Sequence, residues 1–222
     1  MAGGAARLST PPAIGAGSAP RIWFADEWLV VAEKPADLLA VPGRGEAGRD
    51  HFWGRVQTLF ADVLVVHRLD MATSGLIVLA RGLPVQRRLN RAFAERQVHK
   101  VYEALVEGCV QADEGQIDAP LICDWPNRPR QVVDALRGKP ALTHWRVVQR
   151  RPDCTRMTLE PVTGRSHQLR VHLQTLGHPI CGDTLYNPQA ARHPRLMLHA
   201  AELRFAHPES GQDCHFSSPC PF

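Results

Sequence analysis

The chain has 222 residues, of which 44% are apolar, and a formal net charge of +4 at pH 7. This length and composition are typical of a globular protein with one large or two small domains and a substantial core. No apolar stretch approaches the roughly 18 residues of a membrane-spanning helix, and the modest positive charge is compatible with an anionic partner without requiring one.

The six cysteines form no C-x-x-C pair, which argues against a zinc ribbon or a redox motif. Scattered cysteines are typical of reduced thiols in the cytosol. We therefore expect a cytoplasmic protein with no bound metal.

Residues 1–20 are rich in Ala, Gly and Pro, with one Arg, no acidic residue and no continuous apolar run. We interpret this segment as a disordered N-terminal arm rather than a signal peptide. Residues 21–222 are expected to form the folded part.

The pattern predicts many strands and few helices. Strands are expected as a pair in 21–35, in 63–66 and 76–80 around a polar loop, in 98–108, as a pair in 141–150 and 155–164, and late in 195–208. Helical spacing favours helices over 51–62, 83–97 and 165–177, whereas 37–50 and the Pro-rich 120–131 are expected to be loops. Without regular β-α alternation, this order indicates an α+β fold with a mixed, largely antiparallel central sheet and flanking helices.

The helix over 83–97 is amphipathic, with a basic face formed by Arg87, Arg88, Arg91 and Arg96. Such a face is usually solvated and carries no function, but it could also contact an anionic partner.

Asp70 directly follows the apolar run 63–66, in a polar loop that also holds His67 and Arg68. A carboxylate at the end of a strand has a rigid platform and could act as a nucleophile or a general base. From position alone, an aspartate that caps a turn or a helix is the more common case. A nearby guanidinium would favour the ionised carboxylate in either case.

A second polar segment, "GRSHQLRVH", runs from Gly164 to His172. Arg165 would lie at the start of a helix, where Ser166 can cap, and is suited to pair with a carboxylate or a phosphate. A surface ion pair of little energetic value is the alternative. His167 and His172 are five residues apart, so they do not form the i, i+4 pair of a zinc helix.

Tyr102 is one of two tyrosines and lies in the strand over 98–108. A strand tyrosine is most often a half-buried packing residue. The functional alternative is a ring that stacks on a flat ligand and offers its hydroxyl.

The segment "HRLDMATSGLIVLAR" resembles the signature of the RluA family of pseudouridine synthases. Five further segments match the family in the same order: "VVAEKP…LLAVPG", "KVYEALVEG", "GRSHQLRVHL", "LGHPICGD" and "LMLHA". Together they cover roughly residues 21 to 217. Within the family, the chain is similar to members that modify both 23S ribosomal RNA and tRNA, and the catalytic pattern begins too early to leave room for an S4-type domain. One departure is Asp37, where the family usually has a glycine.

The resemblance implies that the protein isomerises uridine to pseudouridine in RNA. The N1–C1′ bond breaks, the uracil rotates and C5 joins C1′, so the atoms balance and no cofactor is required. Asp70 is implied as the catalytic aspartate, by attack on C1′, by addition to the uracil ring or by removal of a sugar proton. Tyr102 is implied to stack on the uracil and assist late proton removal from C5, and Arg165 to pair with Asp70.

The target uridine must leave the base stack to expose C1′. Arg68 is implied to fill the gap that it leaves. The resemblance makes hairpin loops in 23S rRNA and the tRNA anticodon stem-loop the expected partners, bound by a monomer. We expect the RNA contacts to come from His67, Arg68, Thr73, Arg128, Arg130 and Arg170.

Two other functions remain open to test. A catalytically silent RNA-binding factor would gain nothing from an aimed carboxylate beside a polyanion. A carboxylate hydrolase usually works with a second acid, and no other motif supplies one.

Overall fold

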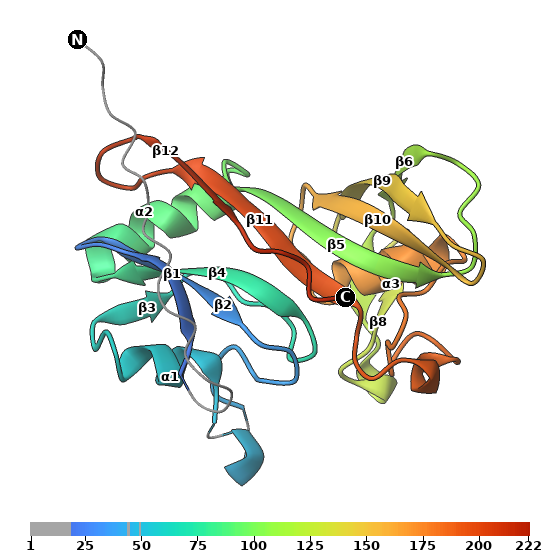
Figure 1. Cartoon of the computed structure of the whole chain (residues 1–222), viewed down its shortest axis with the longest axis horizontal. Helices are drawn as coiled ribbons and strands as arrows, with labels where there is room; N and C mark the ends of the chain where they lie inside the picture. The colour runs from blue at the N-terminus through green and yellow to red at the C-terminus, as the bar shows by residue number, and fades with distance from the viewer. Residues whose placement is uncertain (1–18, 44, 49) are drawn as a thin grey trace.

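The computed structural model describes residues 19–43, 45–48 and 50–222 (Figure 1). The arm expected over residues 1–20 lies almost wholly outside the described residues. No helix among the described residues is long and apolar enough to cross a membrane.

A ten-stranded sheet forms the framework of the molecule. Its main path runs β1-β2-β4-β11-β5-β10-β9-β6, with β12 paired to β11 and β3 paired to β4. Only the β4–β11 pair is parallel among these neighbours; the others are antiparallel. The strands are β1 (Arg21–Ala25), β2 (Leu29–Lys34), β3 (Val63–Val65), β4 (Ser74–Arg81), β5 (His99–Glu107), β6 (Glu114–Asp118), β9 (Leu142–Arg150), β10 (Cys154–Pro161), β11 (Leu198–Ala206) and β12 (Asp213–Ser217). The prediction of an α+β fold with a mixed, largely antiparallel sheet is confirmed.

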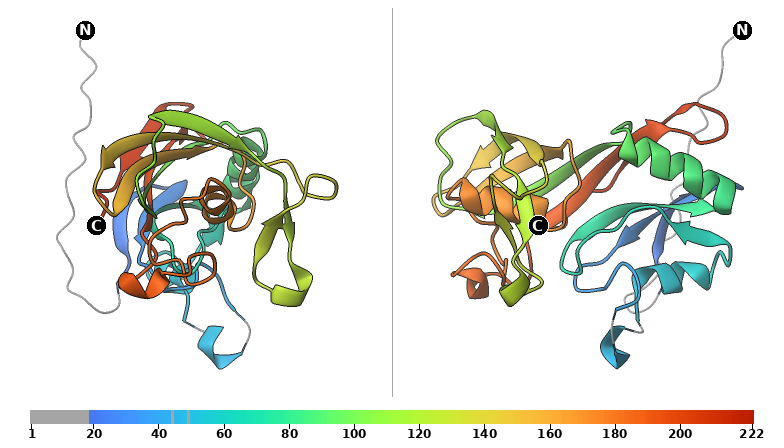
Figure 2. Two further views of the ribbon diagram at one scale, coloured as in Figure 1. Left: turned by 90° about the vertical axis from the view of Figure 1, so that its right-hand side faces the viewer. Right: turned by 180° about the vertical axis from the view of Figure 1, so that it is seen from behind.

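The helices are few, as the sequence pattern predicts, and each is shorter than expected. The α-helices are α1 (Phe52–Gln57), α2 (Leu83–Ala94) and α3 (Gln168–Thr175), and the 3-10 helices are η1 (Glu46–Gly48), η2 (Trp125–Asn127) and η3 (Ala190–Arg192). Figure 2 shows α1 and α2 on opposite faces of the part of the sheet built by β2 and β4.

Strands β2 and β4 are buried on both faces, which explains their continuous apolar sequence. Alternate residues of each strand point to opposite sides of a sheet. Those on one side pack with α1 in a cluster that includes Val30, Ile77 and Phe52. Those on the other side pack with α2 in a cluster that includes Val31 and Leu89.

The long strands β5 and β11 connect the two ends of the molecule (Figure 1). A third cluster surrounds β5, β10 and α3 and includes Ala104, Met157 and Leu173. The loop that carries Asp70 lies between β3 and β4, and Tyr102 lies on β5. The sheet therefore brings together residues that are distant in sequence.

The segment expected to be a Pro-rich loop is instead a small hairpin. Strands β7 (Leu121–Cys123) and β8 (Gln131–Val133) pair antiparallel, and η2 lies between them. The sequence did not predict these strands for two reasons. Each strand has only three residues, and the prolines between them favour a loop. Strand β6 was also not predicted, because its sequence EGQID has little apolar content.

Gly75 makes the closest backbone approach next to the Asp70 loop. Its φ is +121°, a conformation that L side chains rarely adopt. A Cβ at this position would lie 2.3 Å from the carbonyl oxygen of Ala200, its partner in the parallel β4–β11 pair. Glycine is therefore required for β4 and β11 to meet here.

We expect Gly75→Ala to lower the free energy of unfolding by more than about 3 kcal/mol, because it adds a backbone clash to an unfavourable φ. Urea denaturation followed by circular dichroism measures the change. Gly177→Ala is the matched control, since Gly177 also has a positive φ, +87°, but an added Cβ would meet nothing within 4 Å. The control is expected to lose about 1–2 kcal/mol. Equal losses in the two variants would contradict the close approach.

Candidate active site

A cleft of about 100 Å³ opens where the Asp70 loop, β5 and the segment before α3 meet. Asp70, Tyr102, Arg165 and Arg170 all line it. Two larger depressions, of about 460 and 700 Å³, share Arg68 with this cleft. Together they form a hollow surface around a small central pocket.

Asp70 reaches this cleft from a loop that is fixed at both ends. Its side chain is 30% exposed. Its backbone carbonyl accepts a hydrogen bond from the Thr73 amide at 3.1 Å, and the neighbouring Leu69 is buried in the core. The carboxylate is thus held in place and remains accessible to a ligand.

Arg170 is the ion-pair partner of Asp70. Its Nη1 lies 3.4 Å from Asp70 Oδ2, while its Nε and Nη2 each donate to one oxygen of Asp183 at 2.7 Å. Burial disfavours the charged guanidinium, but the hydrogen bonds to Asp183 prevail and raise the pKa of Arg170. The guanidinium is therefore a fixed positive charge facing Asp70.

Asp183 holds the Arg170 guanidinium in place. It is 1% exposed, and its Oδ1 also accepts backbone hydrogen bonds from Leu185 and Tyr186. The ring of Tyr186 lies 5.1 Å from the Arg170 guanidinium carbon. Sequence analysis missed Asp183, because the only signal for it was its place in the matching segment "LGHPICGD".

The expected pair between Arg165 and Asp70 is wrong. Arg165 is exposed, and its Nε donates to the carbonyl of Pro140 at 3.0 Å. Helix α3 begins at Gln168 rather than Arg165, because His167 adopts the left-handed conformation with φ +55° and no side chain caps the helix there. The expected Ser166 cap is absent, and Gln168 Oε1 instead accepts from the Arg165 amide at 3.0 Å.

The prediction that Arg170 contacts RNA does not fit its position in the structure. It is 5% exposed and held by two carboxylates, so it offers no free face to a phosphate. The motif that contains both arginines does lie at the cleft, as expected. Arg170, rather than Arg165, is the one that pairs with Asp70.

Tyr102 lies on β5 beside Asp70, as expected. Burial and the negative charge of Asp70 both raise its pKa, so the phenol stays protonated at neutral pH. Lys100, two residues earlier, lines the same cleft, and burial lowers the pKa of its amine.

His67 and Thr73 hold the loop that carries Asp70. His67 Nε2 accepts the Val78 amide at 3.0 Å, and its ring stacks on Phe93 with a centroid distance of 4.6 Å. Desolvation lowers the pKa of His67 to about 3, so the ring is neutral and can accept that bond. Thr73 is buried.

His167 faces Asp70 from the other side, with Nε2 4.0 Å from Oδ2. Its Nδ1 lies 2.7 Å from the hydroxyl of Tyr186. Burial lowers the pKa of His167, although the charge of Asp70 opposes this effect.

Three of the expected RNA contacts are exposed or lie on exposed loops. Arg68 is exposed at the mouth of the cleft and has no hydrogen-bond or ion-pair partner in the described part of the chain. Arg128 lies over the ring of Trp125 at 4.8 Å, and Arg130 lies over Tyr186 at 5.4 Å. Both are on the β7–β8 hairpin.

Lys34 was not singled out in the sequence, yet it holds the loop that carries Asp70. It is fully buried, and its Nζ donates to the carbonyls of Pro35, Leu38 and Met71 at 2.7–2.9 Å. Burial lowers the pKa of this amine to about 7, against the opposing charge of Asp70. Asp37, the departure from the family pattern, adopts φ +60° in the same turn, a conformation that favours glycine.

Comparisons with known proteins identify the family of the chain. A family model described as RNA pseudouridylate synthase matches residues 28–175. The chain belongs to this family. It is 49% identical to the "Dual-specificity RNA pseudouridine synthase RluA" of Escherichia coli strain K12, over 90% of this chain and 93% of that protein. The protein of the same name from Vibrio cholerae is also 49% identical, over 90% and 82%.

A solved structure, "Human RNA Pseudouridylate Synthase Domain Containing 1", has the same fold, with a TM-score of 0.79 and 28% identity over 95% of this chain and 87% of that one. The chain is thus an RNA pseudouridine synthase, an isomerase, and its resemblance to the RluA family is confirmed.

We expect Arg170→Met to lower the free energy of unfolding by about 3–5 kcal/mol, because it leaves the buried Asp183 without its cation. The matched variant Arg165→Met removes an exposed guanidinium and is expected to change it by less than about 0.5 kcal/mol. Urea denaturation at pH 7 measures both. A loss in Arg165→Met as large as in Arg170→Met would contradict the assignment of Arg170 as the buried partner.

Proposed function

We propose that this enzyme converts uridine to pseudouridine in both ribosomal RNA and tRNA, at uridines in hairpin loops of 23S rRNA and of the tRNA anticodon stem. The observation that carries the proposal is the partly exposed Asp70 carboxylate in a cleft between Tyr102 and the fixed Arg170 guanidinium. The two classes of RNA are inferred from the relatives named dual-specificity, which are 49% identical over most of their length.

In this proposal Asp70 is the group that acts on the flipped uridine. Arg170 faces the carboxylate with a positive charge and orients it, through the 3.4 Å contact with its oxygen. Because the isomerisation breaks N1–C1′ and forms C5–C1′ with no atom gained or lost, the reaction itself calls for no cofactor.

Tyr102 is proposed to stack on the uracil and to assist removal of the C5 proton late in the reaction. Its raised pKa keeps its hydroxyl in the neutral form. Lys100 and the other cations around the cleft favour the approach of a polyanion.

The target base must leave its stack, which costs a few kcal/mol and is least costly in a loop. Arg68 is proposed to occupy the vacated space, since its side chain is exposed at the mouth of the cleft. Arg128 and Arg130 are proposed to bind phosphates from the β7–β8 hairpin, where the exposed Trp125 ring can also stack on a base. His67 and Thr73 are proposed to act on RNA indirectly, by holding the loop.

We further propose that the enzyme acts in the cytoplasm as a monomer. RNA substrates of this kind are cytoplasmic in bacteria. A single chain supplies Asp70, Tyr102 and Arg170 to the same cleft.

We expect Asp70→Asn to abolish pseudouridine formation in an rRNA hairpin and in a tRNA, because the amide cannot supply the negative charge of the carboxylate. Affinity for both RNAs should change by less than about threefold, since a partly exposed carboxylate makes little contribution to binding a polyanion. Pseudouridine-specific chemical mapping and filter binding measure the two quantities.

Asp50→Asn is the control, because Asp50 pairs with Arg55 on the surface away from the cleft. It is expected to retain full activity. Product from Asp70→Asn would contradict the catalytic role. Modification of only one RNA by the wild type would contradict dual specificity while leaving the catalytic role intact.

Affinity for RNA is expected to fall steeply between about 50 and 200 mM salt, because phosphate contacts release counterions. The double variant Arg128→Ala/Arg130→Ala should reduce the slope of log affinity against log salt by about 1–2. Arg204→Ala is the control, since Arg204 pairs with Asp213 at the far end of β11. Salt-independent binding, or equal slopes in the variant and the wild type, would contradict the proposed phosphate contacts.

A further inference from the structure

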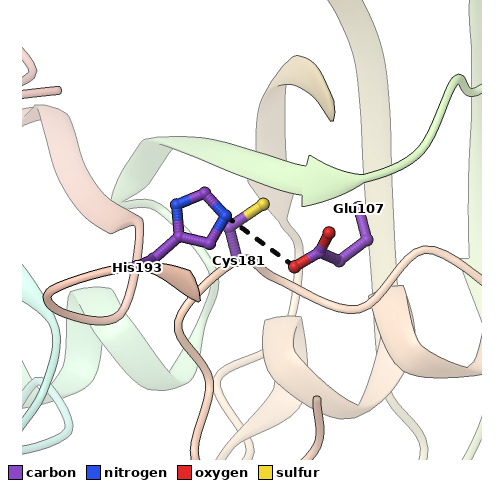
Figure 3. Close-up of side chains that lie close together, drawn as sticks. All are labelled: Glu107, Cys181 and His193. Carbon is purple, nitrogen blue, oxygen red and sulfur yellow. Dashed lines mark ion pairs between the residues drawn. The ribbon is translucent and has the colours of Figure 1, made fainter. Parts of the chain in front are cut away.

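A second cluster of chemically reactive side chains lies apart from the catalytic cleft. Glu107 at the end of β5, Cys181 in the loop after α3 and His193 just after η3 converge so that one ligand atom of each lies within 4.8 Å of the others (Figure 3). None of the three lines the cleft around Asp70. No spacing rule could find this group, because its members come from three separate segments.

The donor set is that of a site for a thiophilic divalent cation. A thiolate, an imidazole and a carboxylate are the three kinds of side chain that bind Zn²⁺, and three protein ligands together with a water make a tetrahedral site. Ligand atoms of such a site lie about 3.3–3.8 Å apart, given metal–ligand distances of about 2.0–2.3 Å. His193 Nε2 lies 3.8 Å from Glu107 Oε1, so the group approaches this geometry already.

The surroundings hold two of the three ligands in place. Asn187 Nδ2 donates to Glu107 Oε1 at 2.8 Å and to the carbonyl of Ile180 at 3.0 Å. Cys181 is tied by its backbone on both sides, donating to the Leu105 carbonyl and accepting from the Met197 amide, each at 2.9 Å. Such outer contacts orient ligands and strengthen metal sites.

His193, the third ligand, lies at the solvent-accessible side of the group. Cys181 is fully buried, whereas the His193 side chain is a quarter exposed. An ion can therefore enter from the His193 side and reach the buried sulfur.

We propose that Glu107, Cys181 and His193 bind one thiophilic divalent cation of the Zn²⁺ class, with water as the fourth ligand. This site is independent of the proposed function. It would cross-link β5 to the segment that begins at Cys181 and carries Asp183, the residue that anchors Arg170. The cation would thus stabilise the support of the catalytic site rather than take part in the reaction.

Binding must displace the thiol proton. Burial and the nearby Glu107 raise the pKa of Cys181 to about 12, so the sulfur is protonated before the ion arrives. The Cys181 S–H bond breaks, a sulfur–metal bond forms and the proton leaves to the buffer.

The test is a titration of the full chain, freed of metal and kept reduced, with Co²⁺ alone and then with Zn²⁺. We expect one equivalent of Co²⁺ to give a thiolate-to-cobalt charge-transfer band in the near ultraviolet, which Zn²⁺ abolishes by displacement. Zn²⁺ should also raise Tm. Wild-type protein without this band would overturn the proposal.

Cys181→Ala should lose the band, and His193→Ala should bind Co²⁺ at least tenfold more weakly. The second variant alters a partly exposed side chain and so keeps the test valid if the first does not fold. Cys214→Ala and His215→Ala are matched controls: His215 pairs with Glu202 as His193 does with Glu107, but Cys214 precedes it in β12 and points to the other face. Wild-type binding by His193→Ala, or loss of the band in a control, would also overturn the proposal.

Discussion

The candidate active site depends on how the charge of one buried guanidinium is neutralised. Arg170 is almost fully buried, and its two shortest contacts go to Asp183 rather than to Asp70. Breaking a buried pair is costly, because the remaining charge is left unpaired. The pair with Asp183 therefore fixes the position of the Arg170 guanidinium independently of its contact with Asp70.

This division has a consequence for Asp70. Its contact with Arg170 is single and longer, at 3.4 Å, and its side chain is 30% exposed. The carboxylate thus receives a positive field without being enclosed by a two-point pair. The proposed role of Asp70 in the reaction needs both conditions, a positive group facing the carboxylate and a face that a substrate can reach.

Lys34 provides a second fixed support for the loop that carries Asp70. Its three carbonyl contacts join the end of β2 to the Met71 carbonyl, one residue after Asp70. Because burial lowers its pKa to about 7, this amine acts mainly as a hydrogen-bond donor that shapes the loop. The position of Asp70 is consequently set by the core and by β2, and its charge environment by α3.

Sequence patterns were reliable where the physics is local and failed where it is not. The apolar runs of β2 and β4 predicted strands, and the polar residues after β3 marked the Asp70 loop. The pairing of Arg165 with Asp70 was inferred from the resemblance, whereas the structure places Arg170, five residues later, against Asp70. The helix start was also expected too early, because nothing in the sequence marks His167 as a residue in the left-handed conformation. Asp183 and Lys34 were missed because their partners lie far away in the sequence, and only the folded chain brings them together.

The two arginines of "GRSHQLRVH" differ in burial and therefore in what they can bind. The planar guanidinium of Arg170 donates to both oxygens of Asp183, which a lysine could not do. This pairing offsets the desolvation cost of burying the positive charge. Arg165, five residues earlier, stays exposed at the rim of the cleft with only a backbone carbonyl as partner. A weak contact of this kind can be exchanged for a phosphate at little cost, whereas the Arg170 pair cannot. Exposure, rather than motif position, therefore separates the arginines that build the site from those available to RNA.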